Sequence, residues 1–211
     1  MFMNKDKRGR KIILIFTALV ILGFSIIFSV RFGSVNYTSG EILKSLFIKS
    51  YDDEILKAIL WDIRIPRILI AVMVGCNLSL AGVLLQAVMK NPLADPGLTG
   101  VSSGASVTAL IIMILYPKAI FFMNFSAFVG GAIACAIVFM LAWKKGLKPI
   151  RVILSGVAIN AILGSITGLM FILFSDEIQG VLSWLNGNLK GKNWRHVTGL
   201  LPYTAVGILA C

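Results

Sequence analysis

The chain has 211 residues, of which 58% are hydrophobic and only 14% charged, and its mean hydropathy is +0.91. So few charges could not cover the surface of a water-soluble domain. The net charge of +11 would suit nucleic-acid binding, but the 20 Lys and Arg residues stand in short clusters between long uncharged stretches. The composition is therefore that of an all-α polytopic membrane protein.

Uncharged stretches predict where the helices cross the membrane. Each stretch is long enough to span a hydrocarbon core of about 30 Å at about 1.5 Å per residue. In lipid such a segment satisfies its backbone hydrogen bonds as a helix. We expect five complete spans and the start of a sixth, over about 12–30, 68–89, 97–117, 119–143, 152–175 and 197–211.

The first stretch follows a basic N-terminus, as a secretory signal does. The apolar core of a signal has about 7–15 residues and ends at a small-x-small cleavage site. Residues 12–30 are longer than that, and Phe28-Ser29-Val30 offers no good site. We expect a retained helix.

Orientation follows from the density of basic residues. With the N-terminus in the cytoplasm, the inside segments are roughly 1–11, 89–96 and 144–151, and both strongest clusters fall inside. One is the N-terminal cluster, and the other is Lys144-Lys145-Lys148-Arg151. Lys and Arg number 10 on each side, so density rather than count favours an N-terminus in the cytoplasm.

Two arginines, Arg64 and Arg67, stand where the first outside loop enters the second span. Basic residues commonly anchor a helix end at the interface by extending their charged heads into water. The alternative is a docking point for an acidic partner on the outer face.

The loop Asn91-Pro-Leu-Ala-Asp-Pro96 contains two prolines, which remove backbone donors and disfavour helix before them. It is either a tight connector or a rigid feature at the inner mouth of a pathway. Asp95 could cap the helix that follows, since a carboxylate suits a helix N-terminus.

Small residues four apart occur twice, as Gly100 with Gly104 and as Gly164 with Gly168. Such pairs let helix backbones approach closely, so packing is the first explanation for both. No Gly-Lys-Ser/Thr follows the first pair, which argues against a phosphate-binding loop.

One face of the fifth span carries Asn160, Gly164, Thr167 and Phe171 at helical spacing. That face could line a weakly polar conduit or pack against a neighbour. The polar residues within the spans are not ionisable, so the sequence shows no intramembrane proton relay. If the protein drives uphill transport, its energy source lies outside this chain.

The cysteines lie inside apolar stretches and there is one histidine, so neither a disulfide framework nor a metal motif is present. We expect no cofactor in this chain. A membrane-embedded enzyme would need a nucleophile, a metal set or paired carboxylates in the bilayer, and the sequence offers no such constellation.

Three motifs in order resemble the FecCD-type permeases of type II ATP-binding-cassette importers, which carry iron–siderophores, cobalamin or haem. They are Arg64-Ile-Pro-Arg67 with Gly75, Gly82 and Gln86; Asn91-Pro-Leu-Ala-Asp-Pro96 with Gly100-Val-Ser-Ser-Gly-Ala105; and Leu154-Ser-Gly156-Val-Ala with Trp184-Leu-Asn-Gly187 and Trp194. The resemblance covers about residues 60 to 200, and the middle motif is the most specific.

The resemblance implies a single transmembrane permease domain over 1–211, in a multi-pass protein of the bacterial plasma membrane. Family members have ten helices and form homo- or heterodimers. They work with two cytoplasmic ATPase subunits and an extracytoplasmic substrate-binding protein. ATP hydrolysis would reside in those ATPases, so this chain would be a transport subunit and not an enzyme.

The resemblance also implies residue roles. Arg64 and Arg67 would pair with acidic residues on the binding protein, and Asn91 and Leu93 would belong to the cytoplasmic gate. The fifth span would line the translocation path through Asn160, Gly164 and Thr167.

The sequence departs from the family pattern at Asn77, where a small apolar residue is usual, and it ends within the sixth helix. We therefore expect a fragment of a longer permease, with the coupling segment beyond Cys211. The expected substrate is a ferric siderophore, with cobalamin second and haem third. A non-transporting membrane scaffold is the alternative from another class.

Overall fold

The computed structural model describes residues 3–31, 40, 54–92, 94–144, 146, 148–175 and 178–210. These residues form helices and connecting turns, and the described ranges contain no β-strand. The chain divides into two compact units, residues 1–75 with 189–206 and residues 76–188 with 207–211.

The first unit contains α1 (Met3–Arg31) and the continuous helical stretch α3 (Glu54–Ala58), η1 (Ile59–Arg64) and the start of α4 (Ile65–Met89). It also holds most of α9 (Trp194–Ala210). Its core joins Ile70 and Met73 of α4 to Val197 of α9. The η1 segment is a π-helix, in which backbone hydrogen bonds join residues five apart instead of four. There the indole N–H of Trp194 donates to the carbonyl of Trp61 at 2.8 Å.

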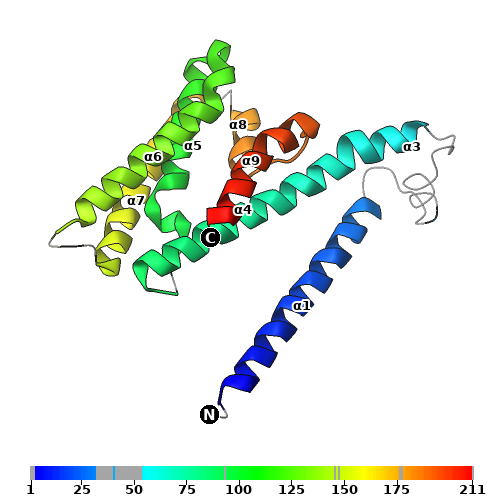
Figure 1. Ribbon diagram of the computed structural model, residues 1–211. Coiled ribbons are helices and arrows are strands. Elements are labelled where there is room, and N and C mark those ends of the chain that lie inside the picture. The colour runs from blue at the N-terminus through cyan, green and yellow to red at the C-terminus, as the bar shows by residue number, and fades with distance from the viewer. Residues whose placement is uncertain are drawn as a thin grey trace. The chain divides into compact units, whose positions relative to one another are not determined.

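The second unit contains the rest of α4, η2 (Pro96–Thr99), α5 (Val101–Leu115), η3 (Pro117–Phe122) and α6 (Met123–Ala142). It continues with α7 (Pro149–Leu173), α8 (Ile178–Leu185) and the end of α9. Within this unit α5, α6 and α7 pack side by side (Figure 1). One core cluster at the α4–α5 connection joins Met89, Ala94, Val138, Ala142 and Val152, and a second surrounds Leu110 and Met170.

Helices α5 and α6 meet at two glycines. A Cβ on Gly104 would overlap the backbone carbonyl of Gly130, and a Cβ on Gly130 would overlap the Thr108 side chain. This close approach lets Thr108 donate its hydroxyl to the Ser126 carbonyl at 2.9 Å, while Ser126 donates to the Thr108 carbonyl at 3.2 Å. The packing role predicted for Gly104 is therefore confirmed.

Four helical stretches in the described residues are long and apolar enough to cross a membrane. They are Gly9–Arg31, Glu54–Met89, Pro117–Ala142 and Pro149–Leu173. Their large apolar side chains are exposed over much of their length, as expected for surfaces that face lipid. The all-α, multi-pass class predicted from composition is confirmed.

The predicted span over 97–117 contains the shorter helix α5, Val101–Leu115. Its 15 residues rise only about 22 Å at about 1.5 Å each. The helix begins late because Gly100 adopts a left-handed backbone with φ of 77° between η2 and α5. It ends before Pro117, which starts the 3-10 segment η3. The turn η2 thus lies where a longer helix was expected.

Candidate functional site

The connection from α4 to η2 has a defined backbone geometry at its first two residues. Lys90 has a φ of 49°, and its N–H donates to the Ala87 carbonyl at 3.3 Å. The N–H of Asn91 donates to the Gln86 carbonyl at 3.2 Å. This pair of bonds is a Schellman helix end, which satisfies two carbonyls that the helix terminus would leave open.

Asn91, predicted as a gate residue, is half-buried, and its carbonyl accepts the Ala94 N–H at 3.1 Å. Leu93, the second predicted gate residue, lies outside the described residues. The start of the connection is thus held by backbone hydrogen bonds at Asn91, and the predicted gate role of both residues stays a prediction.

The turn η2 is closed by its own side chains. One carboxylate oxygen of Asp95 accepts the Gly97 N–H at 2.7 Å, and the Thr99 hydroxyl donates to the Pro96 carbonyl at 2.6 Å. The expectation that Asp95 caps the next helical segment is confirmed, but the segment is the 3-10 turn and not α5.

Helix α7 holds this turn through two residues one helical turn apart. Gly156 lies against the carbonyl oxygen of Leu98, so closely that a Cβ would overlap it. Asn160 donates its side-chain amide to the Gly97 carbonyl at 2.9 Å, and its amide oxygen accepts the Ser103 hydroxyl at 2.7 Å. One side chain of α7 thereby ties together η2 and the first turn of α5.

The remaining predicted path residues on α7 do not share this packing. Gly164 is exposed, Thr167 is half-buried, and a Cβ on Gly164 or Gly168 would meet no atom of the described residues within 4 Å. Phe171, on the same predicted face, packs against the cluster around Leu110 and Met170. No helix in the described part of the chain packs closely against Gly164 or Gly168, so the packing role predicted for this pair is not seen there.

The two arginines predicted to dock a partner have different surroundings. Arg64 is buried, with 8% of its surface exposed, and its guanidinium donates to the carbonyls of Val30 and Arg31 at the end of α1. Arg67 is half-buried, and its Nε has no hydrogen-bond partner among the described residues. The structure brings Arg64 to the C-terminus of α1, where a cation is favourable.

Sequence reasoning found Asn160 but not its partners Ser103 and Gly97, nor the role of Gly156. The sequence did contain one indication of this contact, which is Gly156 in the stretch Ser155-Gly-Val-Ala158. A glycine inside a helix often marks the close approach of another backbone. It did not show which backbone would approach.

The long apolar helices are those of a polytopic helical membrane protein. Comparison with known proteins identifies its family. The model of the FecCD transport family matches residues 19–211. The chain belongs to this family, as the three sequence motifs predicted.

Curated relatives include the Fe(3+)-citrate import system permease protein YfmD of Bacillus subtilis, which is 33% identical over 97% of this chain and 60% of its own length. The cobalamin import system permease protein BtuC of Halobacterium salinarum is 37% identical over 73% of this chain and 42% of its own length. The chain thus spans about 60% of the length of YfmD.

A solved structure has a similar fold. It is described as a metal-chelate type ABC transporter in an inward-facing conformation, and it matches with a TM-score of 0.67 at 23% identity. The match covers 88% of this chain and 56% of the other.

Proposed function

We propose that this chain is a membrane-spanning permease subunit of an ATP-binding-cassette importer, and that it translocates a ferric siderophore delivered by an extracytoplasmic binding protein. The observation that carries the proposal is the FecCD family match over residues 19–211. The bacterial plasma membrane, with the N-terminus in the cytoplasm, is the proposed location. Density of basic residues supports that orientation.

The proposed partners are a second permease subunit, two cytoplasmic ATPase subunits and the binding protein. The spans predicted from the sequence contain no Asp, Glu, Lys, Arg or His. This supports an external energy source, because such spans offer no proton relay of their own. ATP hydrolysis then belongs to the ATPase subunits, and no cofactor is proposed for this chain.

Asn91 and Leu93 are proposed as parts of the cytoplasmic gate. The support for this role is that the neighbouring turn η2 contacts α7 at Gly156 and is hydrogen-bonded to Asn160. A movement of α7 would therefore be transmitted to the connection that carries the gate.

Asn160, Gly164 and Thr167 are proposed to face the translocation path. Gly164 supports this most directly, since it is exposed and no described side chain covers it. The side-chain amide of Asn160 donates through its nitrogen and accepts through its oxygen. Asn160 would therefore act by holding α7 in place beside the path.

The ferric siderophore is proposed because Fe(3+)-citrate and iron(3+)-hydroxamate import systems are among the relatives. Cobalamin is the second candidate, favoured by the relative from Halobacterium salinarum. Haem is the third.

The proposal is tested by uptake of radiolabelled ferric citrate, a ferric hydroxamate and cobalamin in cells with and without the intact gene, with re-expression of the gene as control. Loss of iron uptake alone is the expected result. Loss of cobalamin uptake alone would keep the mechanism and change the substrate. If none of these uptakes changes, haem uptake and co-purification of an ATPase with the protein are measured next. Unchanged haem uptake without a co-purifying ATPase would mean that the protein is a membrane scaffold instead.

A further inference from the structure

The helical stretch that runs from α3 into α4 contains a proline, Pro66, two residues after the π-helix η1. In an α-helix the carbonyl of Asp62 would accept a hydrogen bond from residue 66. Proline has no N–H, and its ring collides with the carbonyl four residues before it. A π-helix, with its longer hydrogen-bonded ring, moves that carbonyl from the position that proline disfavours. Pro66 therefore gives a physical reason for the π-helix at this place.

The π-helix leaves the carbonyl of Trp61 without a donor from the helix backbone. In an α-helix this carbonyl would accept the N–H of Ile65, but that N–H donates to the carbonyl of Leu60. In a π-helix it would accept from the residue five positions later, which is Pro66. The two N–H positions that could serve the Trp61 carbonyl are thus engaged elsewhere or lack a hydrogen.

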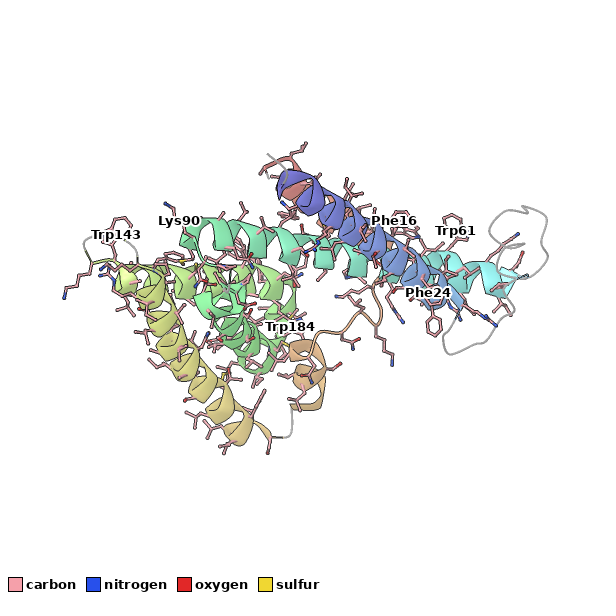
Figure 2. All side chains as sticks on the ribbon, turned by 90° about the horizontal axis from the view of Figure 1, so that it is seen from below. Phe16, Phe24, Trp61, Lys90, Trp143 and Trp184 are labelled. Carbon is pink, nitrogen blue, oxygen red and sulfur yellow. The ribbon has the colours of Figure 1, made fainter. Side chains whose placement is uncertain are left out.

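Trp194, the first residue of α9, supplies a donor in their place. Its indole N–H donates to the carbonyl of Trp61 at 2.8 Å, and both residues belong to the first compact unit. Figure 2 shows Trp61 on the helical stretch, with its own side chain exposed. A carbonyl that loses its partner on folding costs more than a normal hydrogen bond contributes. The indole therefore stabilises the π register of η1.

The start of α9 is held by contacts other than this bond. The carbonyl of Asn193 accepts two N–H groups from the first turn of α9, at 3.0 and 3.4 Å. Val197 lies three residues after Trp194, on the same face of α9, and packs with Ile70 and Met73 of α4. A movement of α9 along α4 would therefore carry the indole away from η1.

The same residues have an alternative α-helical register. A π segment places one extra residue in the helix, so its loss moves each preceding residue forward by one place, about 100° around the axis and about 1.5 Å along it. The place of Leu56, which is fully buried, would then be taken by Lys57. The α register regains the bond from Ile65 to Trp61 but loses the buried leucine. One favourable interaction thus stands on each side of the balance.

We propose that η1 is a joint with two helical registers, and that the indole of Trp194 holds it in the π register. When the start of α9 withdraws, the N–H of Ile65 returns to the Trp61 carbonyl and α3 turns by one residue about its axis. Arg64, at the end of the joint, is bound to the last carbonyls of α1, so the turn takes place on the α3 side. The joint converts a displacement of α9 into a rotation of α3. It does not depend on the proposed transport activity.

The register is tested by labelling single cysteines with a water-soluble maleimide, in the full chain in detergent and without the three native cysteines. The cysteines are placed at Ile55, which is 70% exposed, at Leu56, which is buried, and at Lys57, which is half-buried. Trp194→Phe removes the indole N–H. We expect it to make Leu56→Cys react about tenfold faster and Lys57→Cys more slowly, with Ile55→Cys unchanged.

The matched control is Trp143→Phe, which makes the same change at an exposed tryptophan of the second unit and should alter none of the three rates. Unchanged labelling of Leu56→Cys and Lys57→Cys in Trp194→Phe would overturn the proposal. Faster labelling at all three positions would show local unfolding instead of a change of register, and it would overturn the proposal as well.

A double-mutant cycle with Pro66→Ala tests whether the indole replaces a backbone donor. With an N–H at residue 66, the Trp61 carbonyl has a backbone donor in either register, from residue 66 or from Ile65. We expect Trp194→Phe to lower the folding equilibrium constant, measured by titration with sodium dodecyl sulfate, roughly threefold to twentyfold in the unaltered chain. In Pro66→Ala the same change should lower it less than about twofold. Equal losses in the two backgrounds would mean that the indole does not replace that donor, which would overturn the proposal.

Discussion

Gly156 of α7 lies directly against the carbonyl oxygen of Leu98 in η2. Only a residue without a Cβ permits this approach, and the approach brings the next turn of α7 within hydrogen-bonding distance of the same 3-10 turn. The contact therefore positions Asn160, which donates to the adjacent carbonyl of Gly97 at 2.9 Å. Two neighbouring carbonyls of η2 are thus held by one helix.

Gly156→Ala should destabilise the protein because the added methyl group overlaps backbone rather than a flexible side chain. Overpacking of this kind costs about 1–3 kcal/mol. The matched control is Gly164→Ala on the same helix, where no described atom lies within 4 Å of the new methyl group. Thermal unfolding in detergent measures both, and equal midpoints for the two variants would contradict the close contact.

Asn160 and Ser103 should be coupled energetically. Asn160→Ala removes the bond to Gly97 and the bond from Ser103 together, whereas Ser103→Ala removes only the second. Interhelical hydrogen bonds in membranes average about 0.6 kcal/mol each and reach about 1.7. We therefore expect Asn160→Ala to cost about 1–3 kcal/mol.

A double-mutant cycle isolates the shared bond, and the expected coupling between Ser103→Ala and Asn160→Ala is about 0.5–1.5 kcal/mol. Ser165→Ala is the control, because the Ser165 hydroxyl donates to the Ala161 carbonyl within its own helix at 2.9 Å. Strict additivity of Ser103→Ala and Asn160→Ala would mean that the two side chains do not interact.

The sequence predicted the helices well because their signal is local. Long uncharged stretches locate α1, α4, α6 and α7, and the prolines near residues 92–96 predict the break before α5. The cap by Asp95 also follows from sequence, since its partner Gly97 is two residues away.

The tertiary contacts could not be predicted in the same way. Asn160 lies 63 residues from Gly97 in the chain, and its helix has polar or small residues on several sides. Gly104 and Gly164 look equivalent in sequence, yet Gly104 packs against Gly130 and Gly164 meets no described neighbour. Periodicity shows that a helix face is small or polar but does not show what covers it.

Gly130→Ala should destabilise the α5–α6 pair, because its methyl group would overlap Thr108 and the carbonyl of Gly104. The two helices would have to separate, weakening the reciprocal bonds between Thr108 and Ser126. We expect a loss of about 1–3 kcal/mol in the free energy of unfolding. Gly82→Ala, with no described atom within 4 Å of its Cβ, is the control. A loss no larger than that of the control would contradict this packing.

Arg64 and Arg67 should respond differently to charge removal. Arg64→Gln takes a cation from the C-terminal carbonyls of α1, where such a charge contributes about 0.3–1 kcal/mol and up to about 2 when partly buried. Arg67→Gln removes no hydrogen bond of Nε within the described residues. We therefore expect a lower thermal midpoint for Arg64→Gln than for Arg67→Gln. The reverse order would contradict the capping role of Arg64.

This difference also sharpens the test of the proposed docking of a binding protein. Reversal of both charges should weaken capture of the proposed binding protein. Arg64 is buried against the end of α1, whereas Arg67 is half-buried, and a single ion pair at an exposed position contributes only about 0–1 kcal/mol. Arg64→Glu also disturbs α1, so Arg67→Glu alone is the cleaner variant, with Arg195→Glu as a control of equal charge change.

Binding-protein affinity and substrate uptake are measured alongside the thermal midpoint. Weaker capture by Arg67→Glu at an unchanged midpoint supports docking. Unchanged capture by the double variant would leave both arginines as helix anchors.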